Sequence, residues 1–150
     1  MIRDELYMQL ALLLARQGAL QGEIPVGAVV VQDDEVIAWA HNEKEARQDA
    51  TAHAEMLAMA RAARYLGSWR LQQATMYCSL EPCSMCAGAM INTRLKRLVY
   101  ASRDPKAGAA GSVIDLVRYP GLNHQVEVRG GILEEESSKL LKEFFTDLRK

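Results

Sequence analysis

The sequence has few cysteines, little net charge and no long apolar run, and each of these features argues against particular classes of protein. It has only three cysteines in 150 residues, too few for the disulfide framework of a small secreted domain, which indicates a reducing compartment and hence a cytoplasmic protein. Its net charge is −1, so overall charge argues neither for indiscriminate nucleic-acid binding nor against a local basic patch. The N-terminus is acidic and the apolar run at residues 10–15 is short, so we expect no signal peptide and no membrane span.

The chain does contain enough apolar material for one hydrophobic core. Hydrophobic residues make up 49% of the sequence, and this length and composition suit a single domain spanning residues 1–150. No repeat, linker or low-complexity segment interrupts it. We therefore expect every functional residue to lie in one folded unit.

Hydrophobic periodicity predicts helices alternating with strands. Two β-rich runs, 26–31 and 36–40, flank an acidic turn at Asp33 and Asp34 and predict a hairpin. In chain order, the other expected elements are a helix over about 3–19, a helix up to about Tyr65, a strand at 76–80, a helix at 83–92, a strand at 97–101, a short helical piece at 113–117, an edge strand at 125–129 and an amphipathic helix over 133–150.

The order strand, helix, strand in the middle of the chain predicts parallel pairing, because the connecting segments are long enough for a crossover. The expected fold is therefore α/β, a three-layer α/β/α sandwich around a mixed sheet of about five strands. In the last helix, the apolar face is most simply interpreted as part of the core. That face consists of Leu140, Leu141, Phe144, Phe145 and Leu148.

Two short motifs carry the chemistry. Residues 53–55 read H-x-E, and residues 82–86 read P-C-x-x-C. Cysteines at i and i+3 share one helix face, so Cys83 and Cys86 can bind one metal ion, with His53 as a third ligand. Two thiolates and a neutral imidazole balance the charge of Zn²⁺ and leave one tetrahedral position open for water. This ligand set is typical of a catalytic zinc site.

Both motifs have the character of helix starts. Pro82 suits the first position of a helix, and the free amides of that first turn favour the thiolate form of the cysteines. Asp49 or Thr51 is a candidate cap for the other helix. Glu55 is best placed in a first turn facing the cavity, where its carboxylate can carry a proton.

The joint pattern of H-x-E and P-C-x-x-C resembles the signature of the zinc nucleobase deaminases. The likeness narrows to the bacterial tRNA adenosine deaminases and includes residues 25–30, Asn42, 51–55, 80–90, 104–112 and 122–124. Segment 104–112 looks specific to the tRNA-acting branch. The resemblance implies a cytidine deaminase-like fold, one Zn²⁺ per chain, a homodimer, and hydrolytic deamination of adenosine to inosine at the wobble position of a tRNA anticodon loop.

The same resemblance implies roles for individual residues. Glu55 would be the catalytic acid and base, and the zinc ligands would be His53, Cys83 and Cys86. Substrate-binding residues would be Asn42, Ala54, Asp104 and Lys106, with Arg149 and Lys150 as further candidates for RNA contact. The amide of Asn42 can both donate to and accept from a purine edge, although taken alone it is equally compatible with a turn.

Three positions depart from the family pattern without touching the zinc set. Ala50 stands where proline is usual, Ser137 where cysteine is common, and Thr146 where a basic residue is common. The third cysteine, Cys78, lies in an apolar strand and is interpreted as an inert buried thiol.

Other functions share parts of this pattern. A small-molecule deaminase acting on guanine, cytosine or a nucleoside would have the same fold and zinc set, and would turn over free bases. A lone C-x-x-C pair could be structural or redox-active. A silent zinc or RNA-binding module would need neither Glu55 nor an open coordination position.

Overall fold

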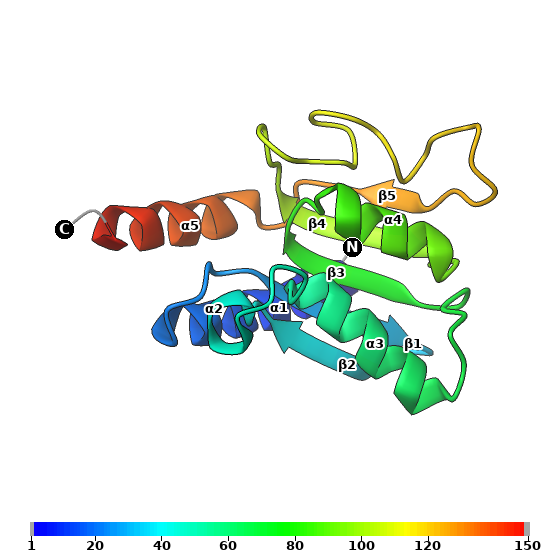
Figure 1. The fold of residues 1–150 in the computed structure, drawn as a ribbon, viewed down its shortest axis with the longest axis horizontal. Helices are drawn as coiled ribbons and strands as arrows, with labels where there is room; N and C mark the ends of the chain where they lie inside the picture. Colours follow the sequence, from blue (N-terminus) through cyan, green and yellow to red (C-terminus); the bar gives the residue numbers. More distant parts are fainter. Residues whose placement is uncertain (1, 149–150) are drawn as a thin grey trace.

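A five-stranded sheet with the strand order β2-β1-β3-β4-β5 runs through the protein. The computed structural model describes residues 2–148 (Figure 1). The elements are α1 (Ile2–Leu20), β1 (Gly27–Gln32), β2 (Glu35–His41), α2 (Lys44–Arg47), α3 (Ala54–Leu66), β3 (Thr75–Leu80), α4 (Ser84–Asn92), β4 (Arg97–Ser102), β5 (Glu127–Arg129) and α5 (Glu134–Leu148). Arg149 and Lys150, the two candidate RNA contacts at the end of the chain, lie outside the described residues.

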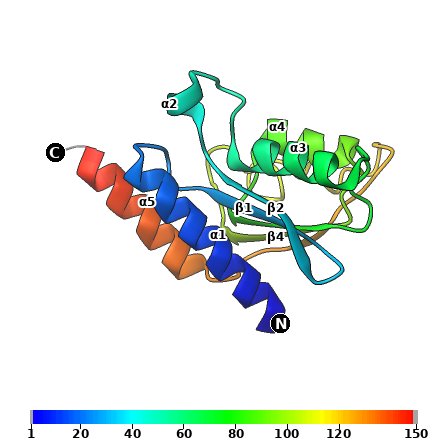
Figure 2. The same ribbon diagram turned by 90° about the horizontal axis from the view of Figure 1, so that it is seen from below.

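The sheet is mixed and helices cover both of its faces. β1 pairs antiparallel with β2 and β3, whereas β3 with β4 and β4 with β5 are parallel. Helices α1 and α5 lie on one face, and α3 and α4 lie on the other (Figure 2). The predicted α/β/α sandwich around a mixed five-stranded sheet is confirmed.

Two apolar layers fill the space between sheet and helices, because neighbouring residues of a strand point to opposite faces. Val30, Met76 and Leu98 pack beneath α3 and α4. Val29, Tyr77 and Val99 pack against α1 on the other side. Cys78 is fully buried in the first layer, and this burial raises the pKa of its thiol, as expected of an inert core residue.

The expected hairpin is confirmed. Its two turn residues, Asp33 and Asp34, both have positive φ angles, of 54° and 61°. A tight two-residue hairpin turn requires this backbone, and aspartate tolerates it better than most residues.

Two sequence-based expectations in the second half of the chain are wrong. Residues 113–117 do not form a helix, because the amides of Val113 and Ile114 both donate to the carbonyl of Gly108 and hold the segment in a folded loop. The apolar face of α5 is only partly core: Phe145 and Leu148 are 41% and 67% exposed. Helix α5 extends past the edge of the sheet, so its last turns have no sheet to pack on (Figure 1).

No helix in the described part of the chain is both long and apolar enough to cross a lipid bilayer.

A buried carboxylate joins α1 to three strands. Asp4 is 5% exposed and accepts hydrogen bonds from the Tyr77 hydroxyl at 2.7 Å, from both terminal nitrogens of Arg97 at 2.9 and 2.8 Å, and from Arg129 at 2.7 Å. Arg97 first, and then Tyr77 and Arg129, hold the pKa of Asp4 far below its usual value despite burial. The cluster therefore ties α1 to β3, β4 and β5.

We expect Asp4→Asn to destabilise the protein by about 3 kcal/mol at pH 7, because it leaves two arginines without their buried counter-charge. The pKa of Asp4 is depressed in the folded state, so its contribution is complete above the ordinary aspartate pKa and is lost as pH falls below it. Urea unfolding at pH 7 and pH 3 should show a large gap between variant and wild type at pH 7 and a smaller one at pH 3. A gap that stays constant would contradict this role.

Candidate active site

Three chain segments reach the same edge of the sheet. Strands β2, β3 and β4 all run in one direction, because β1 is antiparallel to both β2 and β3 while β3 and β4 are parallel. The chain therefore leaves β2 at Asn42, β3 at Glu81 and β4 at Arg103 on one side of the molecule. Ligands of open α/β sheets bind outside this carboxyl edge.

The candidate metal ligands meet at two helix starts. His53 and Cys83 are the N-cap residues of α3 and α4, both with extended backbone and neither using its side chain to cap the helix. Cys86 follows in the first turn of α4. His53 Nδ1 lies 3.6 Å from Cys83 Sγ and 3.5 Å from Cys86 Sγ. In the described residues this is the single group of three or more histidine, cysteine or acidic side chains close enough to share a metal ion.

The spacing of these atoms fits a tetrahedral ion. Metal–sulfur bonds of about 2.3 Å and metal–nitrogen bonds of about 2.0–2.1 Å, at tetrahedral angles, place nitrogen and sulfur about 3.5 Å apart. The distances of 3.6 and 3.5 Å between His53 Nδ1 and the two cysteine sulfurs agree with that value. Hydrogen bonds from Cys86 and His53 lower the pKa of Cys83 to about 3, so one thiolate is already favoured in the folded protein.

The expected caps of these helices are wrong in detail. Pro82 precedes the N-cap of α4 and does not occupy its first helical position. Asp49 does not cap α3 but accepts hydrogen bonds from the amide and hydroxyl of Thr51. The side chain that binds the start of α3 is Asn42, whose Oδ1 accepts from the Ala54 amide at 2.7 Å.

Glu55 has an unusual environment. It lies in the first turn of α3, as expected, and is 4% exposed. Its Oε1 is the only buried side-chain oxygen or nitrogen in the described residues that has no hydrogen-bond partner, and burial raises the pKa of Glu55 to about 7. Buried carboxylate oxygens are nearly always hydrogen-bonded, so an orphan beside three metal-ligand atoms fits a group that handles a ligand.

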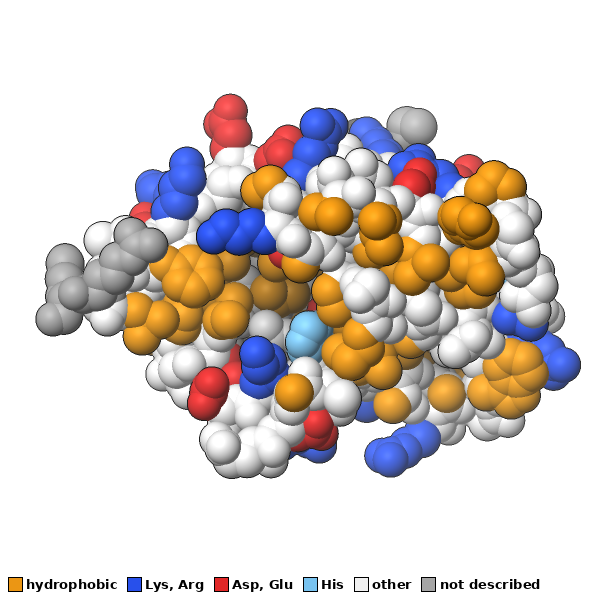
Figure 3. Space-filling view, turned by 45° about the horizontal axis from the view of Figure 1, so that its top comes forward, with side chains coloured by type: hydrophobic (Ala, Val, Ile, Leu, Met, Phe, Trp, Pro, Cys, Tyr) orange, Lys and Arg blue, Asp and Glu red, His pale blue; other side chains and the backbone are white. Residues whose placement is uncertain are grey.

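A small cavity of about 160 Å³ is bordered by Glu55 and by two of the three candidate metal ligands, His53 and Cys83. It is lined by Ile24, Val26, Asn42, Lys44, His53, Glu55, Leu80, Glu81, Cys83, Asp104 and Ala107. This volume is below the roughly 300–1,000 Å³ of pockets for drug-sized molecules, and suits one flat ring system. On the surface, Figure 3 shows a histidine in a hollow between apolar side chains.

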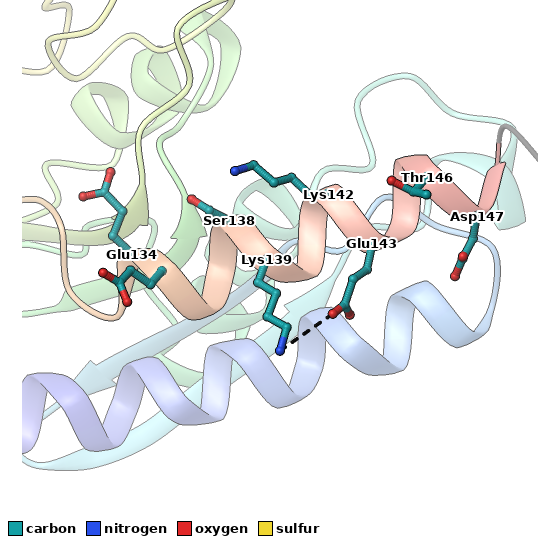
Figure 4. A pocket seen from close by; sticks show the side chains of 8 residues that line it. Glu134, Ser138, Lys139, Lys142, Glu143, Thr146 and Asp147 are labelled. Carbon is teal, nitrogen blue, oxygen red and sulfur yellow. Dashed lines mark ion pairs between the residues drawn. The ribbon is translucent and has the colours of Figure 1, made fainter.

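A larger hollow elsewhere does not have the character of a site. It measures about 850 Å³ and is lined by residues of α5 alone, including the Lys139–Glu143 ion pair at 4.0 Å (Figure 4). One helix bearing solvated charges on its surface offers no enclosed space and no converging groups. The cavity beside Glu55 is therefore the candidate active site.

The residues expected to bind substrate have different surroundings. Asn42 and Asp104 line the cavity. Asn42 is 7% exposed and also donates to the Ile24 carbonyl, while Asp104 Oδ1 accepts from the amides of Lys106 and Ala107. Ala54 is fully buried, and its backbone amide donates a hydrogen bond to Asn42 Oδ1. Lys106 is exposed and does not line the cavity.

Two buried glutamates escaped the sequence analysis. Glu81, 1% exposed, accepts hydrogen bonds from the amides of Asp104, Ala110 and Ser112 at 3.0 Å each, and from the Ser112 hydroxyl. Glu23, also 1% exposed, accepts from the amides of Glu45 and Ala46 at 3.0 and 2.8 Å. The one sequence feature that could have indicated a buried role for Glu81 was its position between an apolar strand and the P-C-x-x-C motif.

Comparison with known proteins agrees with this geometry. A sequence model of the MafB19-like deaminases matches residues 2–149. The chain is 47% identical to the tRNA-specific adenosine deaminase of Bacillus subtilis over all of its own length and 93% of that protein. Among solved structures, a chain from a study of A-to-I editing by tRNA:A34 deaminases at the wobble position is 42% identical with a TM-score of 0.86, covering 89% of this chain and 97% of that one. The guanine deaminase of Nitrosomonas europaea is 26% identical with a TM-score of 0.82, covering 95% and 84%.

The fold and the candidate site define a deaminase of the cytidine deaminase-like class. Within that class, the chain belongs to the family of bacterial tRNA-specific adenosine deaminases.

Proposed function

We propose that the protein hydrolyses adenosine to inosine at the wobble position of a tRNA anticodon loop, releasing ammonia. The observation that carries the chemistry is the orphaned oxygen of Glu55, buried in a ring-sized cavity beside His53, Cys83 and Cys86. The substrate class follows the relative that is 47% identical over the whole chain. An anticodon loop suits a small enclosed cavity, because its unstacked bases can be swung out without opening a duplex.

Zinc is the proposed ion, one per chain, held by His53, Cys83 and Cys86. Two thiolates and a neutral imidazole suit its charge and its tetrahedral preference. When bound there, zinc lowers the pKa of a water ligand towards ~7 and so supplies a nucleophile at neutral pH.

In this proposal Glu55 carries the protons of the reaction. Its carboxylate accepts one proton from the attacking water and delivers it to ring N1 of adenine, then takes the remaining proton of the hydroxyl added at C6 and delivers it to the departing amino group. The first turn of α3 fixes Glu55 two residues from His53, and its burial keeps bulk water from competing for the proton. The C6–O bond forms first, as N1 is protonated, and the C6–N bond breaks afterwards as C6=O forms, so water and adenosine give inosine and ammonia.

The remaining polar groups are proposed to orient the nucleotide. Asn42 retains one N–H of its amide after donating to Ile24, and can present it to the purine edge. Asp104 also lines the cavity, and Ala54 acts through its bond to Asn42. Lys106, exposed on the same loop as Asp104, would meet RNA outside the cavity.

We expect Glu55→Ala to retain zinc and the fold while losing at least ~10²-fold in kcat, because a general acid and base is removed and no ligand is lost. Metal analysis and deamination assays on the same preparation measure both quantities. Cys83→Ala is the matched control and should lose stoichiometric zinc together with activity. Normal turnover by Glu55→Ala would show that another group moves the proton.

The substrate proposal predicts selectivity for RNA. An anticodon stem-loop with adenosine at its wobble position should yield inosine and ammonia, whereas guanine and other free bases should be poor substrates. The likeness to a guanine deaminase makes guanine the most informative comparison. Efficient guanine turnover with an untouched stem-loop would replace the proposal with a small-molecule activity.

We further propose that the protein is a cytoplasmic homodimer. The loop after β4 carries four large apolar side chains that are 38–56% exposed, namely Val113, Ile114, Tyr119 and Leu122. Figure 3 shows apolar side chains gathered on the face that carries α3, α4 and this loop. Contiguous exposed apolar surface commonly marks an interface. Sedimentation at micromolar concentration should give twice the chain mass of 16.7 kDa, and a monomer mass would exclude the dimer.

A further inference from the structure

A cation that forms no ion pair within residues 2–148 lines the candidate active site. Lys44, the first residue of α2, is half-buried and lines the cavity that contains His53 and Glu55. It also lines an adjoining groove of about 490 Å³, which leads from Asn42 to the end of α5. Lys44 therefore borders both the cavity and the groove, as do Ile24 and Asn42.

No acid close to Lys44 forms an ion pair with it in the described residues. Glu55, Glu81 and Asp104 line the same cavity but are not paired with Lys44. Glu43 pairs with Arg47 at 3.1 Å and with Arg61 at 3.2 Å. The buried carboxylate of Glu23 accepts from two backbone amides. Glu45 is exposed and lines the groove but not the cavity. Within residues 2–148 no ion pair neutralises the ammonium group of Lys44.

The backbone of Lys44 is held in place. Its carbonyl accepts hydrogen bonds from the amides of Gln48 and Asp49, which close the turn after α2. The Glu23 carboxylate binds the next two amides and fixes α2 to the segment before β1. A cation on an anchored turn loses less conformational freedom on binding than one on a free loop.

We propose that Lys44 binds the phosphate adjoining the nucleotide whose base enters the cavity. The inference rests on the proposed function, since a nucleotide within RNA carries such a phosphate whereas a free base or nucleoside does not. A cavity of about 160 Å³ takes one base, so the sugar and its phosphates must stay outside it, towards the groove that Lys44 also lines. With a net charge of −1 for the whole chain, affinity for RNA has to come from individual cations placed along the strand.

The test measures binding of an anticodon stem-loop at several salt concentrations to wild type and to Lys44→Gln, which removes the charge and keeps most of the side-chain length. Lys44→Gln should weaken binding about five- to ten-fold and lower the slope of log Kd against log salt by about 1, the signature of one lost phosphate contact. Lys96→Gln is the matched control, because Lys96 is exposed before β4, at the opposite end of that strand from the site. It should bind as wild type does.

A neutral methylphosphonate next to the target nucleotide identifies the partner of Lys44. Wild type should bind this stem-loop about as weakly as Lys44→Gln binds the natural one. Lys44→Gln combined with the methylphosphonate should weaken binding no more than either change alone. Additive losses, or unchanged binding by Lys44→Gln, would overturn the inference. If wild type converts the stem-loop to inosine, such a result leaves the proposed function standing; if wild type neither binds nor converts it, the proposed function fails first.

Discussion

The site depends on two helices that begin at the same edge of the sheet. An N-cap residue has an extended backbone and lies outside its own helix, so its side chain is free to turn towards a neighbour. His53 and Cys83 occupy such positions and meet at 3.6 Å. Asn42 secures the arrangement, because its amide joins the start of α3 to the segment before β1. The sheet order thus brings the candidate metal ligands together at one edge.

Buried carboxylates hold the loops in place by accepting hydrogen bonds from their backbone amides, whereas the strands are held by the apolar core. The loop around residues 104–112 has little apolar side-chain volume, yet Glu81 receives three of its amides and one hydroxyl. Gly108 is required there, since a Cβ would lie 2.4 Å from the carboxylate carbon of Glu81. Glu23 binds α2 in the same way. A buried acid is costly unless fully hydrogen-bonded, so each of these loops has one well-defined position.

The parts of the fold that could be predicted from the sequence are those governed by local rules. Two apolar runs and an acidic turn were enough to predict the β1–β2 hairpin. The spacing within two motifs was enough to predict that His53, Cys83 and Cys86 lie together. Contacts between segments distant in the sequence could not be predicted from such local patterns. The cap of α3 comes from Asn42, twelve residues before Ala54, and the solvation of Leu148 depends on how far α5 extends past the sheet.

The candidate metal ligands and Glu55 do not by themselves determine which substrate is bound. A guanine deaminase with 26% identity shares nearly the whole fold, so the difference between a free base and a nucleotide in RNA must come from surfaces beyond the cavity. A free base needs no more space than the cavity of about 160 Å³ beside Glu55. Here the cavity shares three lining residues with a groove about three times as large, which is also lined by Phe144, Phe145 and Leu148 of α5. Exposed aromatic and apolar side chains in the groove that Lys44 also lines suit a strand with stacked bases and phosphates, and a free base has no use for them.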